Sequence, residues 1–88
     1  MHETSLMKSL LRHIEAVAAE QGARRIVGVS VWLGALSHMS AEHFMEHFVV
    51  ASAGTLAEGA RVDAEESDDP GHGNAQDVLL KSVEIETQ

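Results

Sequence analysis

The chain has 88 residues, enough for one domain with a thin hydrophobic core. Fourteen acidic residues against six Lys and Arg leave a formal charge of -8, which disfavours nucleic acid and membrane surfaces as partners. There is no cysteine, which excludes disulfides, thiolate zinc sites and cysteine nucleophiles. No secretory leader pattern and no apolar stretch of membrane-spanning length is present, so we expect a cytoplasmic protein.

The first third of the chain has the pattern of a helix followed by a strand. Thr4 or Ser5 is expected to cap the helix, and apolar side chains then recur at helical spacing as far as Val17. Gly22 is a typical helix stop. The β-branched run of residues 24–33 then predicts a strand.

The rest of the chain predicts a second helix and two further strands. Ser40 is expected to cap a helix that ends near Ala53, with strands at residues 60–66 and 77–86. A polar loop of residues 67–76 joins these strands. The predicted class is α+β, in the order α-β-α-β-β. We therefore expect a small three-stranded mixed sheet packed against two helices, with residues 1–88 as a single domain.

Strict alternation of side chains assigns the two faces of this sheet. The face toward the helices is expected to carry Val27, Val29, Val31, Leu33, Leu79, Val83 and Ile85. The opposite face would carry Ile26, Trp32, Val78 and Leu80. That second set is more apolar than a solvated face requires, which makes it a candidate interface. Single exposed apolar residues are common, however, so scattered exposure is the alternative.

The first three residues can act together as a metal chelate. The amine of Met1, together with the amide nitrogen and imidazole of His2, can bind one ion, and the amide nitrogen or carboxylate of Glu3 can complete a plane. Square-planar sets rich in nitrogen favour Ni(II) or Cu(II). Many chains begin Met-His by chance, so the tripeptide alone is a weak signal.

Residues His43 to His47 spell H-x-x-E-H, the signature of a class of zinc peptidases, with Glu46 in the place of the base. Such enzymes need a third protein ligand in a substrate cleft, for which a chain of this size has little room. We expect these histidines to flank the core boundary, with a surface metal or partner contact as the alternative. His72, on the polar loop, is not expected to bind metal. No enzyme is predicted.

Five short blocks of sequence, in order along the chain, carry a resemblance to a known family. They are Met1-His2-Glu3 with Ser5-Leu6, Gly22-Ala23-Arg24-Arg25, Leu33-Gly34 with Leu36-Ser37, Gly54-Thr55-Leu56-Ala57-Glu58-Gly59-Ala60, and Lys81-Ser82-Val83-Glu84-Ile85-Glu86. Together these blocks resemble the HypA/HybF family of hydrogenase nickel-incorporation proteins.

The resemblance implies a nickel metallochaperone for maturation of [NiFe]-hydrogenase. It implies Ni(II) binding by Met1 and His2 with Glu3 adjacent, and as partners a nickel-loading GTPase and the hydrogenase large subunit. Members of the family usually carry a zinc lobe with two Cys-x-x-Cys pairs between the last two strands. Here a short hairpin loop of residues 67–76 takes its place, so no structural zinc is expected.

An alternative function keeps the fold without the metal. In that interpretation the chain is an interaction or adaptor module, and it acts as a dimer partner through the apolar residues on the outer sheet face. It predicts a homo-oligomer whose assembly does not respond to nickel and is weakened by substitution of Trp32.

Overall fold

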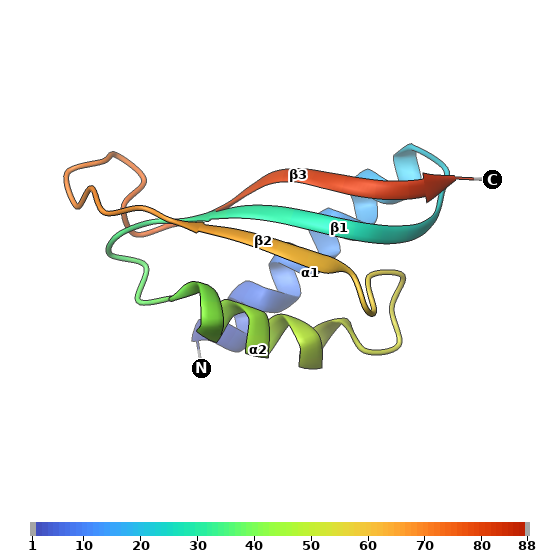
Figure 1. The fold of residues 1–88 in the computed structure, drawn as a ribbon, viewed down its shortest axis with the longest axis horizontal. Coiled ribbons are helices and arrows are strands. Elements are labelled where there is room, and N and C mark those ends of the chain that lie inside the picture. Colours follow the sequence, from blue (N-terminus) through green and yellow to red (C-terminus); the bar gives the residue numbers. More distant parts are fainter. Residues whose placement is uncertain (1, 88) are drawn as a thin grey trace.

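The computed structural model describes residues 2–87 and the side chains of residues 5–87. The elements in chain order are α1 (His2–Glu20), β1 (Ala23–Leu33), α2 (Ala41–Ser52), β2 (Arg61–Glu66) and β3 (Val78–Thr87). The strands form one sheet in the order β2-β1-β3, and both helices cover the same face of it (Figure 1). The predicted α+β class and element order are confirmed.

Helix α1 packs one apolar stripe against the sheet. The buried members of this stripe are Met7, Leu10, Leu11, Ile14 and Ala18. The predicted cap at Thr4 or Ser5 is wrong, because the helix already begins at His2 and both residues lie inside it. No glycine or proline in residues 2–5 interrupts the helix there. At the other end, Gly22 has a φ of 68°, a conformation that glycine adopts without steric cost.

Helix α2 begins where the sequence predicted. The Ser40 side chain accepts a hydrogen bond of 3.1 Å from the amide nitrogen of His43, which satisfies one of the free donors of the first turn. Phe44 and Phe48 are fully buried one helical turn apart, with ring centroids separated by 5.9 Å. Aromatic side chains of this size contribute a large share of the apolar area of a small core. They therefore hold α2 firmly against the sheet.

The central strand β1 is paired on both sides. It runs parallel to β2 and antiparallel to β3, which makes the sheet mixed, as predicted. The edge strand β2 turns Val62 and Ala64 toward the core, and its remaining side chains are exposed. This arrangement leaves one face of β1 for the helices and the other for solvent.

A bulge in β1 changes which residues face the helices. Ile26 pairs with Ile85 and Gly28 with Glu84, so Val27 is an extra residue between neighbouring pairs. The predicted exposure of Ile26 on the outer face is therefore wrong: its side chain is 0% exposed and lies in the core. Val27, predicted to face the helices, is half-buried and lies outside the core cluster. Beyond the bulge Val29, Val31 and Leu33 are buried, as predicted.

A second bulge does the same in β3. Ser82 pairs with Ser30 and Leu80 with Val31, which leaves Lys81 as the extra residue. Val78 and Leu80 consequently pack against the core, and their predicted place on the outer face is wrong. Leu79, predicted to face the helices, is 40% exposed and pairs with Trp32. Val83 and Ile85 pack against the core, as predicted.

The outer face of the sheet is mainly polar. Ion pairs join the two edge strands across β1: Arg61 pairs with Glu84, and Lys81 Nζ lies 2.8 Å from Glu65 Oε1. Gly28 lies beneath the first pair, and a Cβ there would come within 2.7 Å of an Arg61 guanidinium nitrogen. Exposed ion pairs of this kind contribute little stability, but they keep this face solvated.

The β2–β3 loop folds back onto the end of β1. The Gly34 amide donates to the Asp77 carbonyl at 2.9 Å, and the Leu36 amide donates to the Ala75 carbonyl at 2.7 Å. Ala75 is buried, and the His72 ring packs on Trp32 with centroids 4.8 Å apart. The loop predicted at residues 67–76 is therefore an ordered part of the fold.

Replacing Gly34 with Ala should destabilise the protein. The added Cβ would lie 2.8 Å from the Asn74 carbonyl oxygen and closer still to the Ala75 backbone, so the loop would have to move. We expect a loss of about 1–3 kcal/mol in the free energy of unfolding, measured by urea denaturation. Gly73→Ala is the control, since a Cβ there meets nothing within 4 Å. Equal stability of the two variants would contradict the close approach.

The bulge at Val27 can be tested by a pair of alanine substitutions. Ile26→Ala should cost about 2–5 kcal/mol, because it empties a buried site, whereas Val27→Ala should cost less than about 1 kcal/mol. Chemical denaturation of both variants measures the difference. Simple alternation without the bulge predicts the reverse order, so a larger loss for Val27→Ala would overturn the assignment of faces.

Candidate metal centre

The predicted chelate lies at the start of α1. Met1 is outside the described residues, and His2 and Glu3 belong to the first helical turn with side chains that are not described. Amide groups in the first turn of a helix have no acceptor within the helix. The amide nitrogens of His2 and Glu3 are therefore not committed to the hydrogen-bond ladder of α1.

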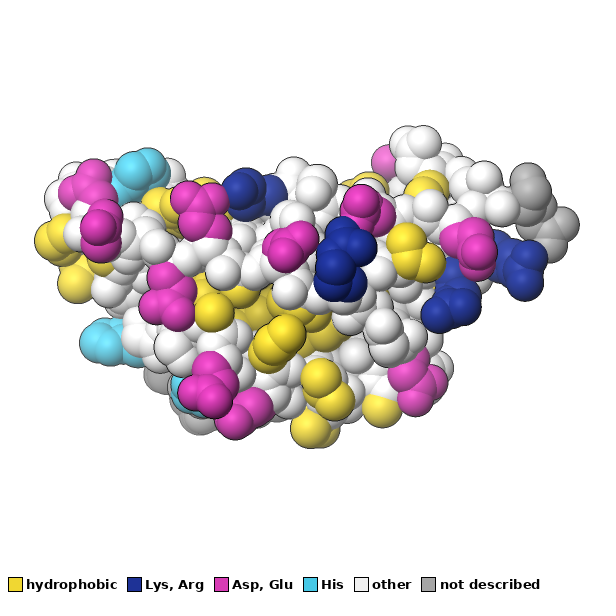
Figure 2. Space-filling view, viewed as in Figure 1, with side chains coloured by type: hydrophobic (Ala, Val, Ile, Leu, Met, Phe, Trp, Pro, Cys, Tyr) yellow, Lys and Arg dark blue, Asp and Glu magenta, His cyan; other side chains and the backbone are white. Residues whose placement is uncertain are grey.

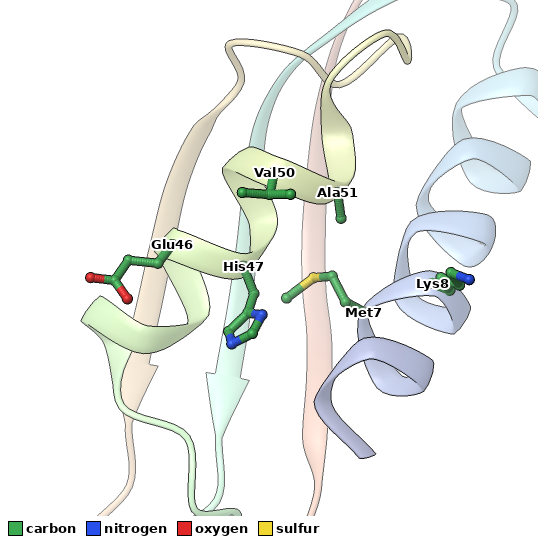
Figure 3. Close-up of a pocket in the computed structure, with 6 residues that line it drawn as sticks. All are labelled: Met7, Lys8, Glu46, His47, Val50 and Ala51. Carbon is green, nitrogen blue, oxygen red and sulfur yellow. The ribbon is translucent and has the colours of Figure 1, made fainter. Parts of the chain in front are cut away.

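The two helices begin at the same end of the molecule and pack along each other (Figure 1). Between them is a cavity of about 540 Å³ lined by Met7, Lys8, Glu46, His47, Val50 and Ala51. In Figure 3 the side chains of His47 and Met7 point toward each other across this space, whereas those of Glu46 and Lys8 point away. A histidine ring is thus held in the space between the helices.

His43 and His47 come together on α2, one helical turn apart. Their Nε2 atoms are 2.8 Å apart and their ring centroids 4.6 Å apart, and both side chains are half-buried. In this contact the Nε2 of one ring donates and the other accepts, and which ring donates depends on the tautomers. The predicted position at the core boundary is confirmed. The close pairing of the ring nitrogens was not predicted, although the i, i+4 spacing was the signal for it.

Among the residues with described side chains, nothing completes a zinc-peptidase site around this pair. The carboxylate of Glu46 is exposed and points away from His47 (Figure 3). In the part of the chain with described side chains, no group of three or more His, Asp or Glu residues comes close enough to hold a metal. His72 is engaged elsewhere, since its Nδ1 accepts a 2.9 Å hydrogen bond from the Asn74 amide.

The predicted interface does not assemble as expected. Of its four residues only Trp32 lies on the outer face, since Ile26, Val78 and Leu80 pack into or against the core. Exposed apolar side chains lie instead on α2, where the largest are Met45, Val49 and Val50, the last 78% exposed. Figure 2 shows hydrophobic side chains gathered over this helix, among scattered acidic ones. This patch was not predicted, although Met45 and Val49 have the spacing of one helix face.

None of the described helices is long and apolar enough to span a membrane.

Comparison with known proteins gives matches in sequence and in structure. Residues 1–72 match the sequence model of a family described as hydrogenase/urease nickel incorporation, metallochaperone, HypA. The hydrogenase maturation factor HypA of Roseiflexus sp. (strain RS-1) is 44% identical over 66 residues, which cover 75% of this chain and 54% of the relative. The corresponding factor of Chlorobium limicola is 41% identical over 66 residues, covering 75% and 57%. The chain thus spans about half the length of these curated relatives.

The fold is also that of a solved structure. The solution structure of the nickel metallochaperone HypA from Helicobacter pylori superposes with a TM-score of 0.81, covering 98% of each chain at 20% sequence identity. An identity this low shows the shared fold alone. The sequence relationship carries the assignment, since the family match covers residues 1–72 of the 88. The chain belongs to the HypA family of hydrogenase/urease nickel-incorporation metallochaperones.

Proposed function

We propose that this chain is a nickel metallochaperone for maturation of [NiFe]-hydrogenase, and that it holds Ni(II) at Met1, His2 and Glu3. The observation that carries the proposal is the family match, which begins at residue 1 and so includes this chelating tripeptide. As its partners we propose a nickel-loading GTPase and the hydrogenase large subunit, in the cytoplasm. The chain itself performs no catalytic step.

The chemistry of the chain start suits an ion that is carried and released. The Met1 amine, the His2 amide nitrogen and the His2 imidazole form adjoining chelate rings, a nitrogen set suited to Ni(II). The amides of the first turn of α1 have no helical acceptor, so binding there breaks no helical hydrogen bond. The positive end of the helix dipole opposes a cation, and the chain's net charge of -8 offsets this opposition. Because the helix dipole weakens binding and the negative charge strengthens it, the site is suited to binding an ion reversibly.

We also propose that this protein works without the structural zinc of its family. The chain has no cysteine, and its β2–β3 connection spans only residues 67–77. That connection is tied to the end of β1 by the backbone bonds of Gly34 and Leu36. Direct hydrogen bonds thus order the part of the fold where relatives carry a thiolate site.

The alternative function, a metal-free adaptor that dimerises through the outer sheet face, has less support. Three of its four contact residues are occupied in packing against the core, and the outer face carries cross-strand ion pairs. The remaining apolar contact is the small cluster of Trp32, Leu79 and His72. No observation favours a second function over the carrier.

His2→Ala should remove the tight nickel site. The substitution eliminates the imidazole and one chelate ring, so we expect the apparent Kd for Ni(II) to rise at least about tenfold, measured by calorimetry on untagged protein. His13→Ala, an exposed position on α1, is the control and should bind as the native chain does. A Gly-Ser extension ahead of Met1 should have the same effect as His2→Ala. If the extended chain binds nickel as tightly as the native chain, the proposed chelate is incorrect.

The proposed role in maturation predicts a cellular outcome. In the source organism with this gene deleted, the nickel content of the hydrogenase large subunit should fall, and the native gene should restore it. The His2→Ala gene should restore little, whereas His13→Ala should restore it fully. Metal analysis of the purified large subunit measures its nickel content in each strain. If the His2→Ala gene fully restored the nickel content of the large subunit, this chelate would have no role in nickel delivery.

A further inference from the structure

We propose that His43 and His47 form a second metal site, which binds a divalent ion such as Ni(II) or Cu(II) through two adjacent imidazole nitrogens. Its two ligands belong to the first two turns of α2 and are distinct from the three residues of the proposed terminal chelate. It therefore does not rest on the proposed function, although both would use the same class of ion.

The spacing of the two rings already fits a chelate. Zinc–imidazole bonds are about 2.0–2.1 Å long. Two bonds of this length at a right angle place their nitrogens about 2.9 Å apart, whereas two at a tetrahedral angle place them about 3.3 Å apart. The Nε2 atoms of His43 and His47 are 2.8 Å apart. This distance matches neighbouring positions of a square-planar or octahedral ion. Ions with those preferences and an affinity for imidazole include Ni(II) and Cu(II).

The fold holds the two histidines in this arrangement. Each precedes a fully buried phenylalanine, His43 before Phe44 and His47 before Phe48, so the core fixes the rotation of α2 about its axis. The Ser40 cap bonds directly to the His43 amide and secures the first turn. A site on a packed helix loses less conformational entropy on binding than one on a loop. The pair is preorganised by the same contacts that stabilise the helix.

There is room for the remaining ligands of the ion. The cavity between the helices opens beside His47, and its volume of about 540 Å³ accommodates several water molecules (Figure 3). Among the side chains of residues 5–87, no group of three or more His, Asp or Glu residues comes close enough to hold a metal. Water molecules in the cavity or groups of a partner can supply further ligands to the ion.

Ion binding replaces the hydrogen bond between the rings. One Nε2 carries a proton in the observed contact, so its lone pair is not free for a metal. When the ion binds, that proton leaves Nε2 and the same ring takes a proton at Nδ1. Both Nε2 atoms then face the ion, and a neutral pair loses no net proton. The exposed carboxylates of Glu42 and Glu46 make the surrounding surface attractive to cations.

The test uses the full chain with the terminal chelate removed, so that only the second site remains. A Gly-Ser extension combined with His2→Ala gives this parent, and Ni(II) and Cu(II) are titrated separately by calorimetry. We expect one equivalent of ion to bind. Adding His43→Ala or His47→Ala should raise the apparent Kd at least about tenfold, because each substitution removes a ligand. Loss of a residue that only hydrogen-bonds to a ligating histidine already lowers metal affinity about 10–100-fold. Adding His13→Ala should change nothing.

Nuclear magnetic resonance of the same parent locates the ion without substituting a ligand. With ¹⁵N-labelled histidine, the Nε2 signals of His43 and His47 should broaden first as Ni(II) is added, ahead of those of His13 and His72. The proposal is overturned if the parent binds no ion, if either alanine variant binds as tightly as the parent, or if other histidines broaden first. These outcomes leave the terminal chelate untouched, because that chelate is tested by comparing the native and extended chains.

Discussion

The burial of one face of β1 beneath both helices is the constraint on which the structure depends. This strand is paired with β2 on one edge and β3 on the other, so every element of the fold contacts it or an element beside it. The core is built on its Ile26, Val29, Val31 and Leu33. A chain of this size cannot bury a second layer. Solvated ion pairs cover the other face of the sheet instead.

Bulges at Val27 and Lys81 adjust the strands to this single core. Side chains alternate along a strand, so one extra residue moves every following side chain to the other face. The extra residues Val27 in β1 and Lys81 in β3 turn Ile26, Val78 and Leu80 toward the helices. The apolar residues that alternation alone assigns to the outer face thereby join the core. This is why the outer face offers a much smaller apolar contact than the sequence suggested.

The two helices carry both proposed metal sites. Helices α1 and α2 begin at the same end of the molecule (Figure 1). The proposed terminal chelate includes the first residues of α1, and the proposed pair of histidines belongs to the first two turns of α2. Phe44 and Phe48 anchor α2 in the core, which leaves His43 and His47 half-buried at its edge. Positions next to core residues are rigid yet reachable by solvent. Metal ligands at such positions would lower the stability of the fold little.

The sequence by itself determined the local elements and the family. Apolar periodicity and the Ser40 cap predicted the second helix and its buried phenylalanines, because those signals act within one or two turns of the chain. Tertiary structure alone decided the faces of Ile26, Val78 and Leu80, since a bulge is defined by pairing with a neighbouring strand. It also decided the 2.8 Å contact of His43 and His47. Sequence spacing puts these two residues on one side of a helix. The distance between their rings, however, depends on the side-chain conformations that packing allows.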